Sequence, residues 1–126
     1  MRDNTLSVLL VDDDPYVCDI CQLIFQHHQL PLTTVNNAVT ALEYLSTHGA
    51  DVIILDLFLP DMDGYRVLDA IRRMPHGPQT KVVATTAYYT NDTGQEIIER
   101  GFDGYLPKPL QADTLIRYLQ SIAAQD

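Results

Sequence analysis

The chain has 126 residues, of which 46% are hydrophobic and 20% are charged, values that are ordinary for a globular domain and exclude a disordered or fibrous protein. Its 17 acidic residues against 8 basic ones give a formal net charge of −9, which argues against direct binding to nucleic acid. The apolar runs are too short to span a bilayer, so we expect one cytoplasmic domain over residues 1–126 without a membrane segment or signal peptide.

Five short apolar segments alternate along the chain with five amphipathic segments. The predicted strands are residues 6–11, 32–36, 51–57, 81–87 and 103–109. The predicted helices are residues 15–28, 38–48, 65–74, 90–101 and 111–124. Asp14 before Pro15 and the residue Asn37 are expected to cap the first two helices, whereas Gly49 and Gly101 are expected to end the second and fourth.

This alternation predicts an α/β fold in which helices cover both faces of a parallel sheet. Right-handed crossovers and short connections leave few topologies, and among them is the doubly wound, flavodoxin-like (βα)5 arrangement with five strands in the order 2-1-3-4-5. Ligands of such sheets bind at the carboxyl ends of the strands, so the functional residues are sought there.

Polar side chains follow four of the predicted strands at their carboxyl ends: Asp12, Asp13, Asp56, Thr85, Thr86 and Lys108. In the order 2-1-3-4-5 the first and third strands are neighbours, which places the three carboxylates within a few ångströms of one another. Such a cluster raises the pKa of its members unless a cation neutralises it. Mg²⁺ takes carboxylate and carbonyl oxygens as ligands and is therefore the expected cofactor.

Cys18 and Cys21 are the two cysteines, and their spacing raises the question of a redox or metal pair. On a helix that starts near Pro15, Cys21 falls on the apolar stripe with Ile24 and Phe25, whereas Cys18 points elsewhere. None of the four histidines shows a matching spacing for a tetrahedral metal. We therefore expect both thiols to be structural.

The stretches LLVDDDP, DVIILDLFLPDMDG, KVVATTA and GYLPKP occur in this order, each at a predicted strand end. Together they resemble the response-regulator receiver domain of two-component signalling, from about Leu6 to the last helix. The resemblance implies that Asp56 accepts a phosphoryl group from a phosphohistidine and forms an acyl phosphate. It also implies a receiver that acts as a signalling switch, limited to its own phosphorylation and a slow autodephosphorylation, and not as an enzyme.

By the same resemblance, Asp13 ligates Mg²⁺ directly, Asp12 does so largely through water, and Asp56 and the backbone carbonyl of Phe58 complete the protein ligands. Thr86 and Lys108 are implied to hold phosphoryl oxygens, and a cis peptide bond is implied before Pro109. Thr86 and Tyr105 are the implied switch residues, which move when the charge of the phosphoryl group arrives. Asp14 is assigned to the helix cap and not to the metal.

The implied partners are a sensor histidine kinase or histidine phosphotransfer protein and, beyond it, a downstream target protein or a fused effector. The output face would consist of the fourth helix, the fifth strand and the fifth helix. Kinase choice is assigned by analogy to Tyr16, Asp19 and Gln22 on the first helix. A stand-alone receiver and a receiver from a hybrid kinase or longer regulator fit the sequence equally.

Single features of the sequence argue against two other functions. An aspartyl-nucleophile phosphatase needs a second aspartate two residues after the nucleophile, where this chain has Phe58, and dinucleotide binding needs a glycine-rich turn that VDDDPY lacks. A receiver-like scaffold that is never phosphorylated remains the alternative.

Phe58 and Tyr88, each two residues after a site residue, lead to the further expectation that bulky aromatic groups shield the phosphoryl group and slow its hydrolysis.

Overall fold

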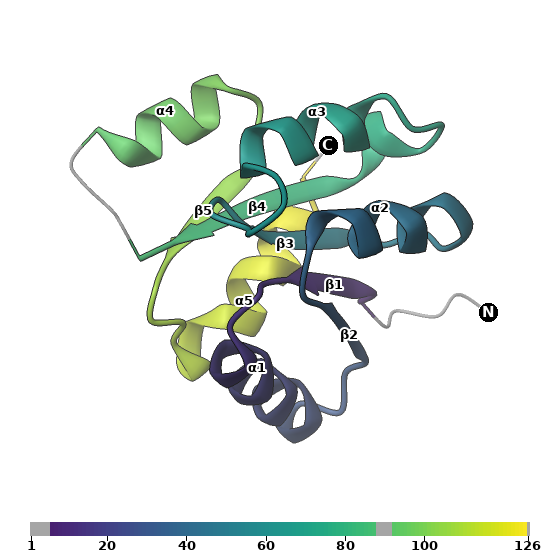
Figure 1. Ribbon diagram of the computed structural model, residues 1–126. Helices are drawn as coiled ribbons and strands as arrows, with labels where there is room; N and C mark the ends of the chain where they lie inside the picture. The colour runs from purple at the N-terminus through teal and green to yellow at the C-terminus, as the bar shows by residue number, and fades with distance from the viewer. Residues whose placement is uncertain (1–5, 88–91, 126) are drawn as a thin grey trace.

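The computed structural model describes residues 6–87 and 92–125, which form a parallel sheet with helices on both faces (Figure 1). The strands are β1 (Val8–Val11), β2 (Leu32–Val35), β3 (Val52–Asp56), β4 (Lys81–Thr86) and β5 (Gly104–Pro107). The helices are α1 (Pro15–His27), α2 (Ala38–Thr47), α3 (Gly64–Arg72), the 3-10 helix η1 (Gly77–Gln79), α4 (Thr93–Glu99) and α5 (Ala112–Ala123). The strand order β2-β1-β3-β4-β5 confirms the predicted topology.

Three helices begin at side chains that accept hydrogen bonds from the first turn. The Asp14 carboxylate accepts a hydrogen bond from the Tyr16 N–H, with Pro15 at the first position of α1. Asn37 Oδ1 accepts one from the Thr40 N–H at the start of α2. Asp63 serves α3 in the same way. These contacts satisfy N–H groups that have no partner within the helix, and the first two confirm the predicted caps.

Some predicted boundaries differ from the structure. The helix α2 ends at Thr47, one residue before the predicted end, because His48 has extended backbone (φ −130°, ψ 141°), and Gly49 follows without the positive φ that is common in helix-ending glycines. Gly101 does have a positive φ of 113° and lies just beyond the end of α4, as predicted. The expected beginning of α4 near residue 90 lies outside the described residues.

The sheet separates two hydrophobic clusters. On one face, Leu9, Ile53, Leu55 and Val82 lie in a cluster with α2, α3 and α4; on the other, Leu10, Ile54 and Val83 lie in a cluster with α1 and α5. Alternate residues of one strand therefore enter different clusters, which explains why strands buried on both faces are continuously apolar. The inward residues predicted for α5 are buried as expected: Leu115, Ile116, Leu119 and Ile122.

This topology brings the carboxyl ends of the strands to one edge of the sheet. β1 lies between β2 and β3, and Val11 pairs in register with Leu55, so the residues after them are neighbours.

Within the described ranges, every helix is too short or too polar to cross a membrane.

Candidate functional site

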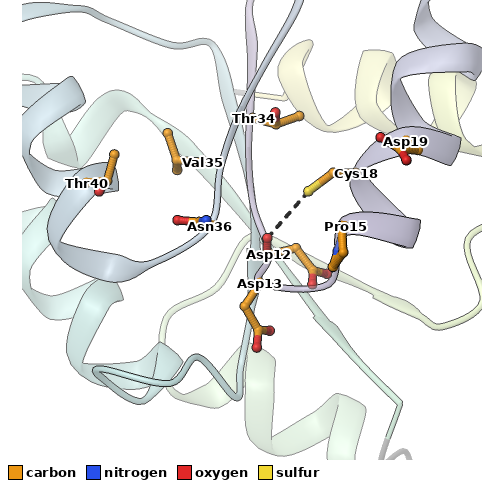
Figure 2. A pocket seen from close by; sticks show the side chains of 9 residues that line it. All are labelled: Asp12, Asp13, Pro15, Cys18, Asp19, Thr34, Val35, Asn36 and Thr40. Atoms are coloured by element: carbon orange, nitrogen blue, oxygen red, sulfur yellow. Dashed lines mark hydrogen bonds between the residues drawn. The ribbon is translucent and has the colours of Figure 1, made fainter.

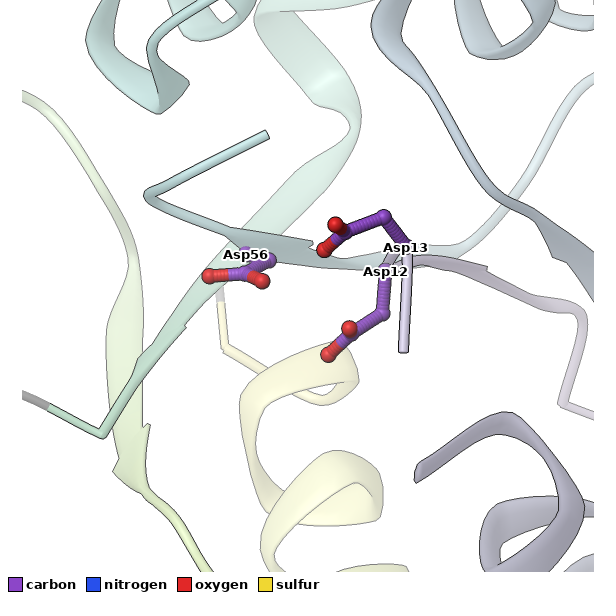
Figure 3. A group of neighbouring side chains, drawn as sticks. All are labelled: Asp12, Asp13 and Asp56. Atoms are coloured by element: carbon purple, nitrogen blue, oxygen red, sulfur yellow. The ribbon is translucent and has the colours of Figure 1, made fainter. Parts of the chain in front are cut away.

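Three carboxylates meet where β1 and β3 end. Asp12 and Asp13 follow β1, Asp56 is the last residue of β3, and one carboxylate oxygen from each lies within 4.8 Å of the others (Figure 3). Asp12 is fully buried and Asp56 is 5% exposed, whereas Asp13 is exposed. The predicted convergence of these three side chains is confirmed.

Lys108 brings a positive charge to this cluster from the loop after β5. Its Nζ lies 2.9 Å from Asp12 Oδ2 and 3.3 Å from Asp56 Oδ2, and the side chain is 16% exposed. The Lys108 backbone N–H donates to the Thr86 carbonyl at 3.0 Å, and the Lys108–Pro109 peptide bond is cis, as the resemblance implied. The lysine is therefore a positioned group of the site and not a solvated surface side chain.

Burial and charge oppose each other at these groups. Burial raises the pKa of the Asp56 carboxyl above its ordinary value, although the Phe58 N–H and the Lys108 ammonium favour the ionised form. Burial alone would lower the pKa of Lys108, but the hydrogen bond and ion pairs with Asp12 and Asp56 outweigh it, so that this pKa is raised. Lys108 therefore stays an ammonium that partly offsets the repulsion among the carboxylates.

The loop between β3 and α3 is held against the site by its own backbone. The Phe58 N–H donates to Asp56 Oδ1 at 3.1 Å, and the Gly64 N–H donates to the Leu57 carbonyl at 2.9 Å. A Cβ added at Gly64 would lie 2.7 Å from the Leu57 Cα, which real Cβ atoms do not reach. Glycine is thus needed at position 64 for the loop to turn back on β3 next to Asp56.

Asp61 connects the same loop to α2, a contact that the sequence analysis missed. Its carboxylate accepts hydrogen bonds from the Ala38 N–H at 2.9 Å and the Val39 N–H at 3.1 Å, and these bonds lower the pKa of Asp61. The partners lie 22 and 23 residues apart in the sequence. No local pattern could have revealed this contact, because it exists only once α2 and the loop are packed together.

Thr85 and Thr86 are both buried at the end of β4. Thr85 pairs in register with Asp56, and its Oγ1 has no hydrogen-bond partner among the described residues. The Thr86 carbonyl accepts from Lys108, but a role of its hydroxyl toward a phosphoryl group stays a prediction. Tyr105 lies on β5 and is partly buried beside α4. Its role as a switch residue also stays a prediction.

Cys18 lies beside the site, whereas Cys21 is buried in the hydrophobic cluster of α1 and α5, and both are free cysteines. Cys18 Sγ donates to the Asp12 carbonyl at 3.4 Å and lines a cavity of about 510 Å³ beside Asp13 and Asn36 (Figure 2). Burial raises the pKa of Cys21 to about 12 and also raises that of Cys18. At neutral pH both are free thiols and not thiolates, which agrees with the structural role predicted for them.

The donor set suits a hard divalent cation. The Asp12, Asp13 and Asp56 carboxylates are oxygen donors, and one of the three is exposed, which leaves a route from solvent. Sulfur and imidazole ligands, which softer metals prefer, do not belong to this cluster.

Comparisons with known proteins agree with this geometry. The family model described as the response regulator receiver domain matches residues 8–120. An uncharacterised 14.6 kDa protein of Leptolyngbya boryana is 31% identical over 91% of this chain and 88% of its own length. The signal transduction histidine-protein kinase BarA of Escherichia coli K12 is 28% identical over 87% of this chain, which spans 12% of BarA.

Among solved structures, the receiver domain of sensor histidine kinase PA1611 from Pseudomonas aeruginosa PAO1 superposes with a TM-score of 0.85. The two sequences are 26% identical, and the match covers 96% of this chain and 99% of that one. That structure has a magnesium ion coordinated in its active-site cleft.

Proposed function

The chain belongs to the response regulator receiver domain family, and on this basis we propose that Asp56 accepts a phosphoryl group from a phosphohistidine of a partner protein. The observation that carries the proposal is the contact of one lysine with two strand-end carboxylates. Lys108 Nζ lies between Asp12 and Asp56, at the place where a transferred phosphoryl group would need positive charge.

In the proposed reaction an Asp56 carboxylate oxygen forms the new bond to phosphorus while the P–N bond to the partner's imidazole breaks. The imidazole nitrogen keeps the electron pair of that bond and takes a proton from solvent. An ionised carboxylate needs no general base, so the other side chains position groups and stabilise charge. Lys108 leaves Asp56 Oδ2 and pairs with a phosphoryl oxygen, and Thr86 donates a hydrogen bond to another.

The proposed metal ligands are the carboxylates of Asp12, Asp13 and Asp56 and the backbone carbonyl of Phe58. Bound Mg²⁺ would supply charge neutralisation for the carboxylates and for the phosphoryl oxygens. The buried Asp12 keeps its orientation through two contacts, because its Oδ1 accepts from the Asp14 N–H at 2.9 Å and its Oδ2 pairs with Lys108. These contacts hold a carboxylate in place before any ligand arrives.

We place the chain in a two-component system or phosphorelay, as a single receiver domain over residues 1–126 in the cytoplasm. Its phosphoryl donor would be a sensor histidine kinase or a histidine phosphotransfer protein, in line with its similarity to part of a histidine kinase such as BarA. The output face would be α4, β5 and α5, which would bind a downstream protein or a fused effector. The domain would act as a switch, whose own chemistry ends with phosphorylation and slow hydrolysis at Asp56.

The test is to incubate the protein with acetyl phosphate and Mg²⁺ and to measure its intact mass, for wild type and for Asp56→Asn. We expect an adduct of about 80 Da in wild type that requires Mg²⁺ and is missing from the variant. Asp19→Asn is the matched control for the small-molecule donor, since it removes an exposed carboxylate on α1 that lines the neighbouring cavity, and acetyl phosphate should phosphorylate it as it does wild type.

Two other results would contradict the proposal. An adduct that persists in Asp56→Asn would mean that another residue is the nucleophile. No adduct with acetyl phosphate, phosphoramidate or a phosphorylated kinase domain would favour the scaffold that is never phosphorylated.

A further inference from the structure

The ring of Tyr105 lies in a space that exists because residue 94 of α4 has no side chain. A Cβ added at Gly94 would lie 2.6 Å from Cζ, 2.7 Å from Oη and 3.0 Å from Cε1 of Tyr105. These distances place the tip of the ring against the backbone of α4, where Gly94 is buried. Tyr105 is partly buried and packs against the hydrophobic cluster shared by α2, α3 and α4.

Contacts this short cannot coexist with a methyl group, so a substitution at position 94 forces something to move. The obstructing atoms belong to the far end of one side chain, which turns about two torsions, and not to the backbone. At Gly77, by contrast, an added Cβ would lie 1.8 Å from the Ile71 carbonyl oxygen, part of a helix that cannot turn aside. A methyl group at position 94 therefore displaces the Tyr105 ring before it displaces α4.

The backbone under the ring is fixed from the other side. The Tyr105 N–H donates to the hydroxyl of Tyr118 on α5 at 3.0 Å, on the side of β5 where no other strand of the described residues pairs with it. Tyr118 fits because residue 104 is also a glycine, whose added Cβ would lie 2.3 Å from Tyr118 Oη. With the strand held in place, the side chain of Tyr105 is the part that moves relative to α4.

We propose that Gly94 is the positioning residue that seats the Tyr105 ring against α4 and so couples that ring to the helix. This inference rests on the proposed function, in which phosphorylation of Asp56 changes an output face that consists of α4, β5 and α5. We call the space above Gly94 that holds the Tyr105 ring the seat. A movement of the ring into or out of the seat changes the surface of α4 at Gly94, so the movements of the ring and of α4 depend on each other. Glycine at position 94 makes α4 less stable than alanine would. In return, it leaves the space that the Tyr105 ring occupies.

The seat is tested on the unphosphorylated protein by combining Gly94→Ala with Tyr105→Leu, which lacks the ring atoms that crowd position 94. In the Tyr105→Leu background, Gly94→Ala should raise Tm, because alanine favours the helix and nothing obstructs it. In the wild-type background it should lower Tm or raise it less. Gly49→Ala is the control, because a Cβ there meets nothing within 4 Å, and its effect should be equal in both backgrounds. An equal effect of Gly94→Ala in both backgrounds would overturn the seat.

The coupling is tested by NMR of labelled tyrosine rings and backbone amides, before and after addition of Mg²⁺ and beryllofluoride as a phosphoryl analogue. In wild type, the Tyr105 ring signals and the amide of Ile97 on α4 should shift together. In Gly94→Ala the ring signals should start from a displaced position and respond much less, whereas the Leu57 and Phe58 amides beside Asp56 should respond as in wild type.

Each failure in that experiment has its own meaning. If the Leu57 and Phe58 amides of wild type do not respond, the proposed function fails, and the seat is still decided by the Tm comparison. If they respond and the Tyr105 ring shifts equally in wild type and Gly94→Ala, the coupling through Gly94 is wrong.

Discussion

Phe58 is the residue whose side chain we propose to shield a phosphoryl group on Asp56 from water. Its backbone N–H is bonded to Asp56 Oδ1, and its side chain is 58% exposed at the edge of the site. Replacing the ring with a smaller polar group opens the approach of water to phosphorus. We expect Phe58→Asn to speed autodephosphorylation by about five-fold, equivalent to about 1 kcal/mol in the barrier. The measurement is the loss of the phosphorylated mass over time.

Leu23→Asn is the control for that experiment, since Leu23 is 66% exposed on α1 and should leave the hydrolysis rate unchanged. A wild-type half-life of seconds that Phe58→Asn does not alter would contradict the shielding role. Tyr88, the other aromatic residue proposed to shield the phosphoryl group, lies outside the described residues.

Asp61 is expected to stabilise the fold in a pH-dependent way. Hydrogen bonds from the Ala38 and Val39 N–H groups lower its pKa in the folded state, so folding favours the ionised carboxylate. Its contribution is therefore complete above the unfolded pKa of about 3.9 and is lost as the pH falls through the lower folded value. Asp61→Asn should lower the free energy of unfolding at neutral pH, and the difference from wild type should shrink below about pH 4.

Urea unfolding across this pH range provides the measurement, with Asp69→Asn, an exposed carboxylate on α3, as the control. The control removes the same charge without the contact to α2. If Asp61→Asn lowered the free energy of unfolding equally at all pH values, the lost charge of the carboxylate would not be the cause of the lower stability.

The residues whose position the sequence predicted are those that sit at strand ends. Asp12, Asp13, Asp56 and Lys108 could be placed because the order of the strands determines which ends are neighbours, and the structure brings the four together. Contacts of Asp61 and of Tyr118 could not be placed, because they depend on how two separately predicted elements are packed. The choice between Thr85 and Thr86 also exceeds what alternation determines, since both are buried.

At the level of elements, β5 depends on α5 for part of its hydrogen bonding. The Tyr118 hydroxyl accepts from the Tyr105 N–H on the outer side of the edge strand, and burial raises the pKa of this tyrosine. Tyr118→Phe keeps the ring and removes only the acceptor. Because a partly buried N–H then loses its partner, the free energy of unfolding should fall by about 1 kcal/mol.

Chemical denaturation of Tyr118→Phe and of Tyr16→Phe makes the comparison, since Tyr16 is 71% exposed and its hydroxyl should contribute nothing measurable. Hydrogen exchange at the Tyr105 amide should also become faster in Tyr118→Phe only. Equal stability of the two variants would mean that water replaces the hydroxyl at the strand edge without cost.

The boundaries of elements were predicted where a local side chain determines them. Asp14 and Asn37 act within four residues of their own position, and both cap helices as predicted. Gly49 lies directly after the C-cap of α2, as predicted, but the helix ends because His48 has extended backbone and not through a positive φ at the glycine. The 3-10 helix η1 was not predicted. It is stabilised by Arg72 at the end of α3, whose guanidinium donates hydrogen bonds to the Gly77 and Thr80 carbonyls.

At the level of the whole molecule, the alternation of apolar and amphipathic segments was enough to predict the topology. The three central strands β1, β3 and β4 are short and almost wholly buried, and strands buried on both faces require helices above and below a parallel sheet. The two hydrophobic clusters meet this requirement and leave charged groups at the carboxyl edge. The fold therefore carries the electrostatic cost of placing three carboxylates side by side, and Lys108 offsets only part of it.

This remaining repulsion predicts that Mg²⁺ stabilises the entire domain and not only the site. A ligand that binds the folded state alone adds about 1.4 kcal/mol at a concentration about ten times its Kd, which would raise Tm by a few degrees in a domain of this size. Asp13→Asn should raise Tm in the absence of Mg²⁺, because an exposed member of the cluster loses its charge, and should reduce the further increase that Mg²⁺ produces.

Thermal unfolding at several Mg²⁺ concentrations and constant ionic strength separates this effect from general screening. Asp19→Asn changes the net charge equally on an exposed position of α1, and it should keep the full response to Mg²⁺. If Asp13→Asn and Asp19→Asn responded identically, Mg²⁺ would be acting on the charge of −9 as a whole and not on the three carboxylates. A reduced response in Asp13→Asn alone would assign the stabilisation to the edge where β1 and β3 end.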